Sequence, residues 1–274
     1  MKGRVGLFLS RSNAWAHSTE AVQLIEELGF GTVWISGGVR PNVLDEVEPM
    51  LAAGDLTVCT AVQNIWLDPA AEVNRRWEDL DAQYPGRLVL GLGVSHKSTV
   101  EARGLGPFTQ PVRRMSEYLD ALDAVPADRR LLGALGPKML QLAAQRTLGS
   151  HPYLVTTDYT AKAREVLGDA LLAPQQAVVL DDEPARGRAT ARTFLRTYLE
   201  LPNYRNNWLR SGFTEADLAD GGSDRLVDAL IVVGGRTDVQ ERIDAHIAAG
   251  ADHVAVHVVA QDPTDLADAW RTLA

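Results

Sequence analysis

Two short segments of the sequence carry side chains that could do chemistry. His96 follows the glycine-rich run Gly91–Gly93 closely, and an imidazole at such a place can contact a ligand or move a proton near neutral pH. Gly136-Pro137-Lys138 has the form of a helix start, where free N–H groups beside a lysine make a phosphate-binding site. A capping histidine and an ordinary proline-initiated helix are the simpler interpretations of the same residues.

Other chemically capable residues point to structure. His253 and His257 lie on one face of a predicted strand, but four residues of strand span roughly 13 Å, which is too far for one metal ion. We therefore predict no metal site. Asp181-Asp182-Glu183 is typical of a strand end and a helix cap. Cys59 is the single cysteine, so the chain can form no internal disulfide and no multi-cysteine metal site.

The elements that must position these residues alternate along the chain. Eight apolar runs are followed by patterns typical of amphipathic helices, which predicts a single-domain (β/α)8 TIM barrel over residues 1–274. The runs lie at 5–9, 32–35, 56–62, 87–92, 130–134, 151–155, 177–180 and 253–259. An open doubly wound sheet is disfavoured because His96 occupies the place of the third glycine in a G-x-G-x-x-G fingerprint.

One connection is unusually long, between the seventh and eighth predicted strands. It keeps helical periodicity through Leu226 and Leu230, which predicts an ordered helical insertion rather than a disordered linker. A last helix is predicted after Asp262-Pro263. In a barrel, the ends of all strands meet at one rim, where active sites lie.

The overall composition limits the partners. The chain has 274 residues, is 46% hydrophobic and carries a net charge of −9, so it lacks the positive field expected of a binder of nucleic acids or anionic membranes. No run approaches the ~20 apolar residues of a membrane span, and the N-terminal apolar run is too short for a signal peptide. We expect a cytoplasmic protein that binds a small molecule.

Several strand-end stretches, in this order and spacing, resemble the bacterial luciferase-like monooxygenase superfamily, and in particular its coenzyme F420-dependent oxidoreductases. The resemblance covers nearly the whole chain and implies the barrel independently, as well as a homodimer. The segment Leu201–Asn207 resembles one subgroup of these enzymes. The matching stretches are 27–35, 60–66, 85–96, 134–143, 151–156 and 248–254.

The resemblance also implies roles for individual residues. The third strand end matches the place where a non-proline cis peptide forms a bulge behind the deazaflavin ring, and 135–138 matches the segment that holds the phosphate-bearing tail. The implied cofactor-binding residues are Thr60, Ala61, Val62, Asn64, Ser95, His96, Ala134, Leu135, Gly136, Pro137, Lys138 and Met139. The implied walls of the substrate pocket are Trp66, Asn203, Tyr204, Asn207 and Trp208.

Two proton-handling groups of the family are missing. Gly37-Gly38 stand where its dehydrogenases carry an acidic residue and a histidine, and Val94 stands where they carry a glutamate. We therefore assign catalysis to His96, in an oxidoreductase that transfers a hydride between coenzyme F420 and an unidentified small organic substrate. The alternatives are a flavin mononucleotide (FMN)-dependent monooxygenase and a barrel that binds a cofactor without catalysis.

Overall fold

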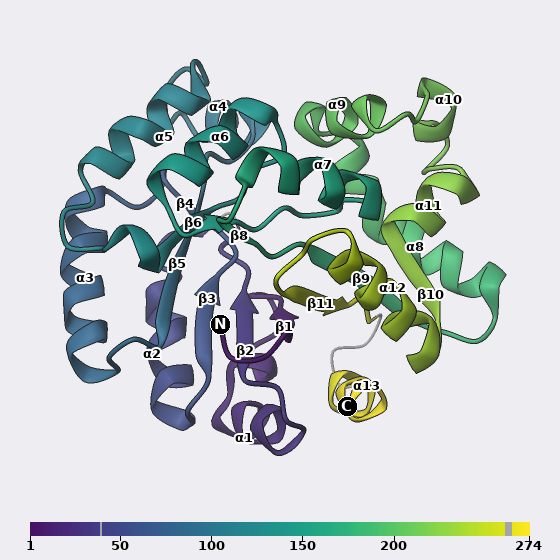
Figure 1. The fold of residues 1–274 in the computed structure, drawn as a ribbon, viewed down its shortest axis with the longest axis horizontal. Coiled ribbons are helices and arrows are strands. Elements are labelled where there is room, and N and C mark those ends of the chain that lie inside the picture. The colour runs from purple at the N-terminus through teal and green to yellow at the C-terminus, as the bar shows by residue number, and fades with distance from the viewer. Residues whose placement is uncertain (39, 261–264) are drawn as a thin grey trace.

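The computed structural model describes residues 1–38, 40–260 and 265–274, and within them a parallel sheet curls on itself with helices around it (Figure 1). The strands follow the order β10-β9-β11-β1-β2-β3-β5-β6-β7-β8, and β4 pairs with β5. Their bounds are β1 (Val5–Leu9), β2 (Thr32–Ile35), β3 (Thr57–Thr60), β4 (Gln63–Asn64), β5 (Leu88–Gly93), β6 (Arg130–Leu132), β7 (Gly149–Ser150), β8 (Leu171–Leu172), β9 (Gln175–Leu180), β10 (Ile231–Gly234) and β11 (Val254–Val258).

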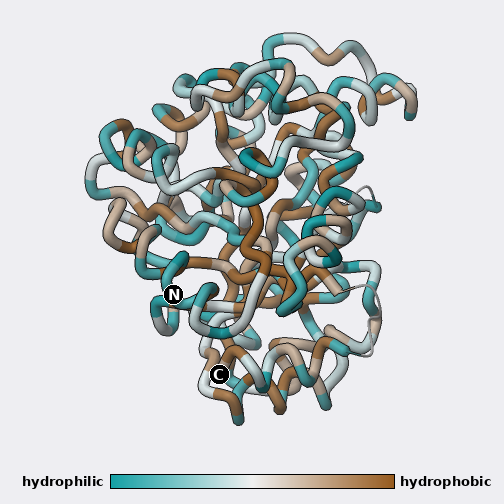
Figure 2. The backbone as a smooth tube through the Cα atoms, turned by 90° about the vertical axis from the view of Figure 1, so that its right-hand side faces the viewer, coloured by the Kyte–Doolittle hydropathy of each residue, from teal (hydrophilic) through white to brown (hydrophobic). Residues whose placement is uncertain are grey.

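Helices follow most of the strands and cover the outside of the sheet (Figure 1). They are α1 (Thr19–Glu27), α2 (Leu44–Ala53), α3 (Ala70–Gln83), α4 (Lys97–Ala102), α5 (Pro111–Asp120), α6 (Pro137–Arg146), α7 (Thr157–Leu167), α8 (Pro184–Leu199), α9 (Pro202–Arg210), α10 (Glu215–Leu218), α11 (Asp224–Leu230), α12 (Arg236–Ala248) and α13 (Leu266–Leu273). Hydrophobic residues gather along the central strands and alternate with hydrophilic ones in the helices (Figure 2). Within the described residues, no helix is both long enough and apolar enough to cross a bilayer.

The sheet closes through one continuous segment, residues 171–180. At its start β8 pairs with β7, and the N–H of Ala173 donates to Ser150 O at 2.9 Å. On its other edge the N–H of Ala255 donates to Pro174 O at 2.9 Å, and β9 pairs with β11. The segment therefore acts as a single barrel strand, and the predicted TIM-barrel fold is confirmed.

The sixth and seventh predicted strands differ in extent from the observed ones. The predicted strand at 151–155 was wrong: β7 ends at Ser150, because Pro152 has no N–H to donate and Leu154 has a φ of +53°. The run at 177–180 is part of the longer β9, and β8 was not predicted.

The long connection after β9 holds five helices, α8 to α12, and also a strand, β10, that the helical interpretation missed. β10 pairs with β9 in parallel over Ile231 to Gly234. β10 occupies the edge of β9 along which β7 would continue if β7 did not end at Ser150. Asp262 and Pro263, predicted to precede the last helix, lie outside the described residues.

The interior of the barrel is filled by aromatic and imidazole rings. Trp34 stacks on His151 with ring centroids 4.2 Å apart, and its Nε1–H donates to His253 Nε2 at 3.0 Å. The other ring nitrogens donate to backbone oxygens: His151 Nδ1 to Ala173 O at 2.7 Å and His253 Nδ1 to Gly3 O at 3.0 Å. Burial lowers the pKa of His151 to about 3 and that of His253 to about 4. Both imidazoles are therefore neutral structural groups.

These buried histidines make stability depend on pH. The folded pKa is about 3 for His151 and about 4 for His246, His253 and His257, against the ordinary histidine value of 6.5. Because the folded pKa values are depressed, the free energy of unfolding is highest above pH 6.5 and falls as the pH drops toward 4, where only the unfolded chain takes up protons at these histidines. Each such histidine lowers the free energy of unfolding by about 2 kcal/mol at pH 5. The urea midpoint is therefore expected to drop clearly between pH 7.5 and pH 5.

The matched control is His246→Gln. His246 lies between the Thr160 hydroxyl at 2.9 Å and Gln176 Oε1 at 3.0 Å, where a glutamine amide keeps hydrogen-bonding capacity without titrating. This variant should show a smaller pH dependence than the parent. Equal urea midpoints for the parent protein at the two pH values would contradict the prediction.

Candidate functional site

The end of the third barrel strand is shaped by close contact with glycines. A cis peptide bond joins Ala61 to Val62, between β3 and β4, at the place that the family resemblance implied. A Cβ on Gly93 would lie 2.3 Å from a methyl carbon of Val62, and a Cβ on Gly37 would lie 2.0 Å from its carbonyl oxygen. The bulge therefore fits only because glycines stand at the end of β5 and just beyond the end of β2.

Two of the predicted cofactor-binding residues support this bulge from inside the protein. Thr60 is fully buried, and its hydroxyl accepts from the N–H of Gly91 and donates to Gly91 O, both at 2.8 Å. Asn64 is 5% exposed, and its Oδ1 accepts from Trp66 N at 3.0 Å. The structure thus gives Thr60 and Asn64 structural hydrogen bonds, whereas Ala61 and Val62 are only half-buried.

The mouth of the barrel has one half built from small residues. Ser10, Ser36, Ala61 and Gly133 lie just beyond the ends of β1, β2, β3 and β6 and are all half-buried. A cavity of about 710 Å³ adjoins this half and is lined by Ser10, Ser36, Gly37 and Gly38 among others. These short side chains leave room for a flat group, but none of them can act as an acid or base near neutral pH.

His96 lies on another part of the rim, beside the long connection. It is the N-cap of α4, and its Nδ1 lies 3.0 Å from Oδ1 of Asn203 on α9. An amide oxygen only accepts, so Nδ1 carries the proton and Nε2 keeps its lone pair. Burial lowers the pKa of His96, which keeps it neutral. Tyr204 packs beside it, with ring centroids 5.8 Å apart. The structure thus brings together residues predicted from separate stretches.

A second polar cluster on the rim was missed by the sequence reasoning. The hydroxyl of Tyr153 lies 3.2 Å from that of Tyr198 and 3.3 Å from Nδ1 of His257. Burial lowers the pKa of His257 to about 4, so its ring is neutral and can accept a proton or a hydrogen bond. The three residues are half-buried and come from β11, α8 and the loop after β7. Only the inward alternation of His253 and His257 on their strand hinted at this cluster.

The start of α6 offers open backbone groups. Gly136 caps the helix, and a Cβ there would meet nothing within 4 Å. Pro137 and Lys138 are exposed, and the N–H of Lys138 has no intrahelical acceptor because it lies in the first turn. An anion could therefore reach both the helix N-terminus and the lysine, as the sequence predicted.

Neighbouring residues of this segment anchor it. Ala134 is 1% exposed and Met139 is 8% exposed, so the part that can touch a ligand narrows to 135–138. The hydroxyl of Tyr159 donates to Ala134 O at 3.0 Å and lies 3.2 Å from Leu135 O. Burial raises the pKa of Tyr159, which keeps it protonated and donating.

The predicted substrate-pocket residues of α9 separate into two groups. Trp208 is fully buried, and its Nε1–H donates to Leu154 O at 3.0 Å, so the prediction that it walls a pocket was wrong. Asn207 is 2% exposed and Tyr204 7% exposed. Asn203 alone of the four is exposed, next to His96.

Trp66, the remaining predicted pocket residue, is half-buried beside the rim. Its Nε1–H donates to Val94 O at 2.9 Å, and the guanidinium of Arg114 lies 4.5 Å from its ring centroid. Trp66 therefore fixes the backbone that carries Val94 and Ser95.

Comparison with known proteins agrees with the resemblance read from the motifs: residues 2–131 match the family model of the luciferase-like monooxygenases. An uncharacterized protein of Mycobacterium tuberculosis is 32% identical over 127 residues, which is 44% of this chain and 36% of that protein. The match thus spans about a third of that relative's length. A 5,10-methylenetetrahydromethanopterin reductase of Archaeoglobus fulgidus is 25% identical, over 85% of this chain and 86% of its own.

Solved structures share the fold over the whole chain. An F420-dependent secondary alcohol dehydrogenase in complex with an F420-acetone adduct has a TM-score of 0.77 at 14% identity, covering 100% of this chain and 98% of its own. The oxygenating constituent of a type II Baeyer-Villiger monooxygenase from Pseudomonas putida, in complex with FMN, has a TM-score of 0.69 at 15% identity, covering 98% and 95%. At these identities the likeness establishes the fold alone.

The glycine contacts predict that two glycine-to-alanine substitutions differ strongly in how much they lower the free energy of unfolding. A Cβ on Gly91 would lie 1.9 Å from the backbone oxygen of Thr60, whereas one on Gly136 meets open space. Gly91→Ala should lower the free energy of unfolding by about 2 kcal/mol or more, because backbone must shift, and Gly136→Ala by well under 1 kcal/mol. Urea unfolding of both variants tests this, and equal midpoints would show that the bulge adapts freely.

Proposed function

We propose that this protein is a coenzyme F420-dependent oxidoreductase acting on a small organic substrate. The observation that carries the proposal is the arrangement of the barrel mouth. A floor of small residues at Ala61 and Val62 lies on the same rim as His96 and as the open N-terminus of α6 with Lys138. The fold shared with the F420-dependent dehydrogenase supports it.

The residues present fit a deazaflavin with a phosphate-bearing tail. Ala61, Val62 and Ser95 would contact the ring, and the backbone from Leu135 to Lys138 would hold the phosphate. The space around Gly136, where a Cβ would touch nothing, is open to such a group. When bound, the deazaflavin supplies the hydride chemistry, and the protein contributes orientation and exclusion of water.

Proton handling falls to the half of the rim that carries histidines. His96 is neutral with a free Nε2, so it is suited to accept a proton from a substrate hydroxyl during oxidation. In the reverse direction the protonated His96 returns this proton to a carbonyl oxygen. The Tyr153 hydroxyl, hydrogen-bonded within the cluster of Tyr198 and His257, is the alternative proton donor. We retain His96 as the proposed catalytic residue.

An FMN-dependent monooxygenase is the second candidate, because the neighbour from Pseudomonas putida holds FMN on the same fold. The two functions differ in the cofactor that binds and in the need for oxygen. A barrel that binds cofactor without catalysis is the third, since Gly37 and Gly38 provide no acid or base.

Fluorescence titration of the purified protein with F420 and with FMN decides among these candidates. We expect F420 to bind at least ten-fold more tightly, which is a difference of about 1.4 kcal/mol. Lys138→Gln should weaken F420 binding several-fold, because it removes a charge beside the phosphate. Lys162→Gln, on the exposed side of α7, is the control and should change nothing. Tighter binding of FMN would favour the monooxygenase, and binding of neither would refute the site.

The role of His96 is tested with the first acceptor found by screening small carbonyl compounds against reduced cofactor. His96→Ala should lower turnover by about 100-fold or more, the usual contribution of general acid–base catalysis, while F420 affinity changes less than about three-fold. Tyr198→Phe is the comparison, since it removes one hydroxyl from the other polar cluster. Full turnover in His96→Ala would remove the assignment, and a loss only in Tyr198→Phe would transfer it to the tyrosine cluster.

A further inference from the structure

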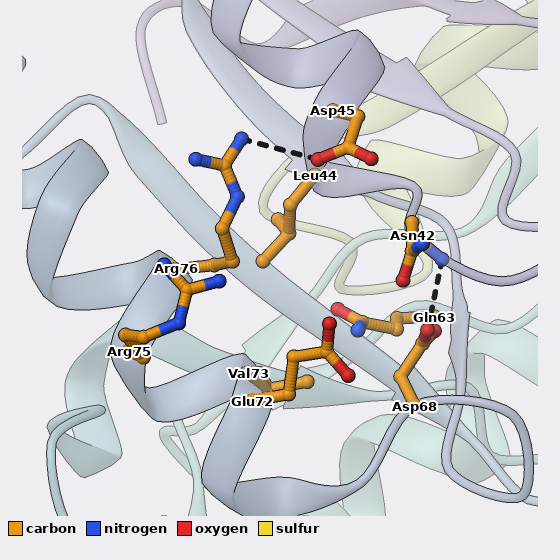
Figure 3. A pocket seen from close by; sticks show the side chains of 9 residues that line it. All are labelled: Asn42, Leu44, Asp45, Gln63, Asp68, Glu72, Val73, Arg75 and Arg76. Atoms are coloured by element: carbon orange, nitrogen blue, oxygen red, sulfur yellow. Dashed lines mark hydrogen bonds and ion pairs between the residues drawn. The ribbon is translucent and has the colours of Figure 1, made fainter.

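A second cavity lies outside the barrel, between α2 and α3, and shares only Asp45 with the cavity at the mouth. Its volume is about 360 Å³. Gln63 from β4 and Asp68 from the loop before α3 line it, together with the first half of α3 (Figure 3). None of these residues has a role in the function proposed above.

Asp68 is a buried carboxylate that forms no ion pair with the residues that the structure describes. It is 4% exposed, and it accepts a hydrogen bond from the N–H of Asn42 at 2.8 Å. Burial raises its pKa, although Asn42, Gln63 and the charge of Arg11 act in the opposite direction. A buried carboxylate that is not fully compensated is costly, so a cationic group entering the cavity would be bound favourably.

The amide of Gln63 is the second observation that points to a ligand. Gln63 is 2% exposed and lines the cavity, and its Oε1 has no hydrogen-bond donor. The Gln63 side chain also hydrogen-bonds to Asp68, which leaves Oε1 as the acceptor for a donor that enters the cavity. Glu72, on the first turn of α3, adds a carboxylate to the same wall.

Two ion-paired arginines, Arg75 and Arg76, line the other end of the cavity. Arg76 pairs with Asp45 at 3.2 Å and with Glu48 at 3.0 Å, but its buried Nε has no acceptor. Arg75 pairs with Asp79. These pairs leave Asp68 and Glu72 without an ion pair to any residue that the structure describes. In Figure 3 the two guanidiniums lie to the left and Asp68 to the right, with Gln63 and Glu72 between them.

We propose that this cavity binds a small zwitterion with a primary ammonium group at one end and a carboxylate at the other, the class of the ω-amino acids. An ammonium group has three N–H donors, and Asp68, Glu72 and Gln63 supply three acceptors. The carboxylate faces the arginines, where Arg76 Nε lacks an acceptor. A divalent cation also prefers oxygen ligands, but the two guanidiniums lining the cavity oppose a bare dication.

Calorimetric titration of the full chain tests the proposal with 4-aminobutyrate, butylamine and butyrate as probes. We expect 4-aminobutyrate to bind with a Kd of about 1 mM or below, butylamine to bind about ten-fold more weakly, and butyrate not to bind at all. The ordering follows from the charges, since only the first probe satisfies both ends of the cavity.

Substitutions of residues that line the cavity test whether 4-aminobutyrate binds there. Asp68→Asn keeps an oxygen for the Asn42 N–H, and Glu72→Gln changes an exposed side chain, so both should fold and weaken 4-aminobutyrate binding at least ten-fold. Glu78→Gln is the matched control, because Glu78 is exposed on the same helix and does not line the cavity. Gln63→Leu should also abolish binding, with folding checked by its thermal midpoint.

Three results would overturn the proposal: no heat of binding with 4-aminobutyrate up to about 20 mM, an equal loss in Glu78→Gln, or binding of Ca²⁺ in place of the amine. The titration needs no F420 and no substrate turnover. Its failure would therefore leave the proposed oxidoreductase function untouched, and failure of that function would leave this cavity unaffected.

Discussion

The tight fit of the segment Thr60–Val62 against glycines is the constraint on which the mouth of the barrel depends. Carbonyl oxygens of this segment lie where Cβ atoms of Gly37 and Gly91 would stand, and a methyl group of Val62 lies against Gly93. No side chain can therefore reach into the mouth from position 37. The titratable groups on this half of the mouth include His17, whose pKa burial lowers, and the ion-paired Arg11 and Glu46. His96 and the Tyr153 cluster lie elsewhere on the rim.

The filled interior of the barrel limits how deeply a ligand can enter it. Trp34 and its two histidine neighbours, His151 and His253, occupy the space below the mouth, where Trp34 stacks on His151 and donates a hydrogen bond to His253. Phe8 closes the layer beneath His257, with ring centroids 4.7 Å apart. A ligand is thus restricted to the rim, where side-chain length rather than barrel diameter decides what fits.

Local patterns predicted most of the fold but not the contacts between distant segments. Alternation of strands and helices was sufficient for the barrel, because each run is apolar and bounded by turn residues. It failed at β10, where Ile231–Gly234 follows a helical pattern directly and becomes a strand only because β9 has a free edge. The pairing of His96 with Asn203, 107 residues apart, could not be read from spacing. Trp208 was placed at a surface because its burial against Leu154 depends on how the long connection folds back.

Arg11 holds the loop after β2 through hydrogen bonds to backbone oxygens of that loop. Its buried guanidinium pairs with Glu46 and donates to the carbonyl oxygens of Gly37, Arg40, Pro41 and Asn42. Every amino acid carries such an oxygen, so these four bonds do not depend on the side chains at 40–42. The further constraints there are the left-handed backbone of Asn42, with a φ of +60°, and the hydrogen bond that the Arg40 side chain donates to Arg11 O. This edge of the mouth is consequently a place where evolution or design can change selectivity without rebuilding the scaffold.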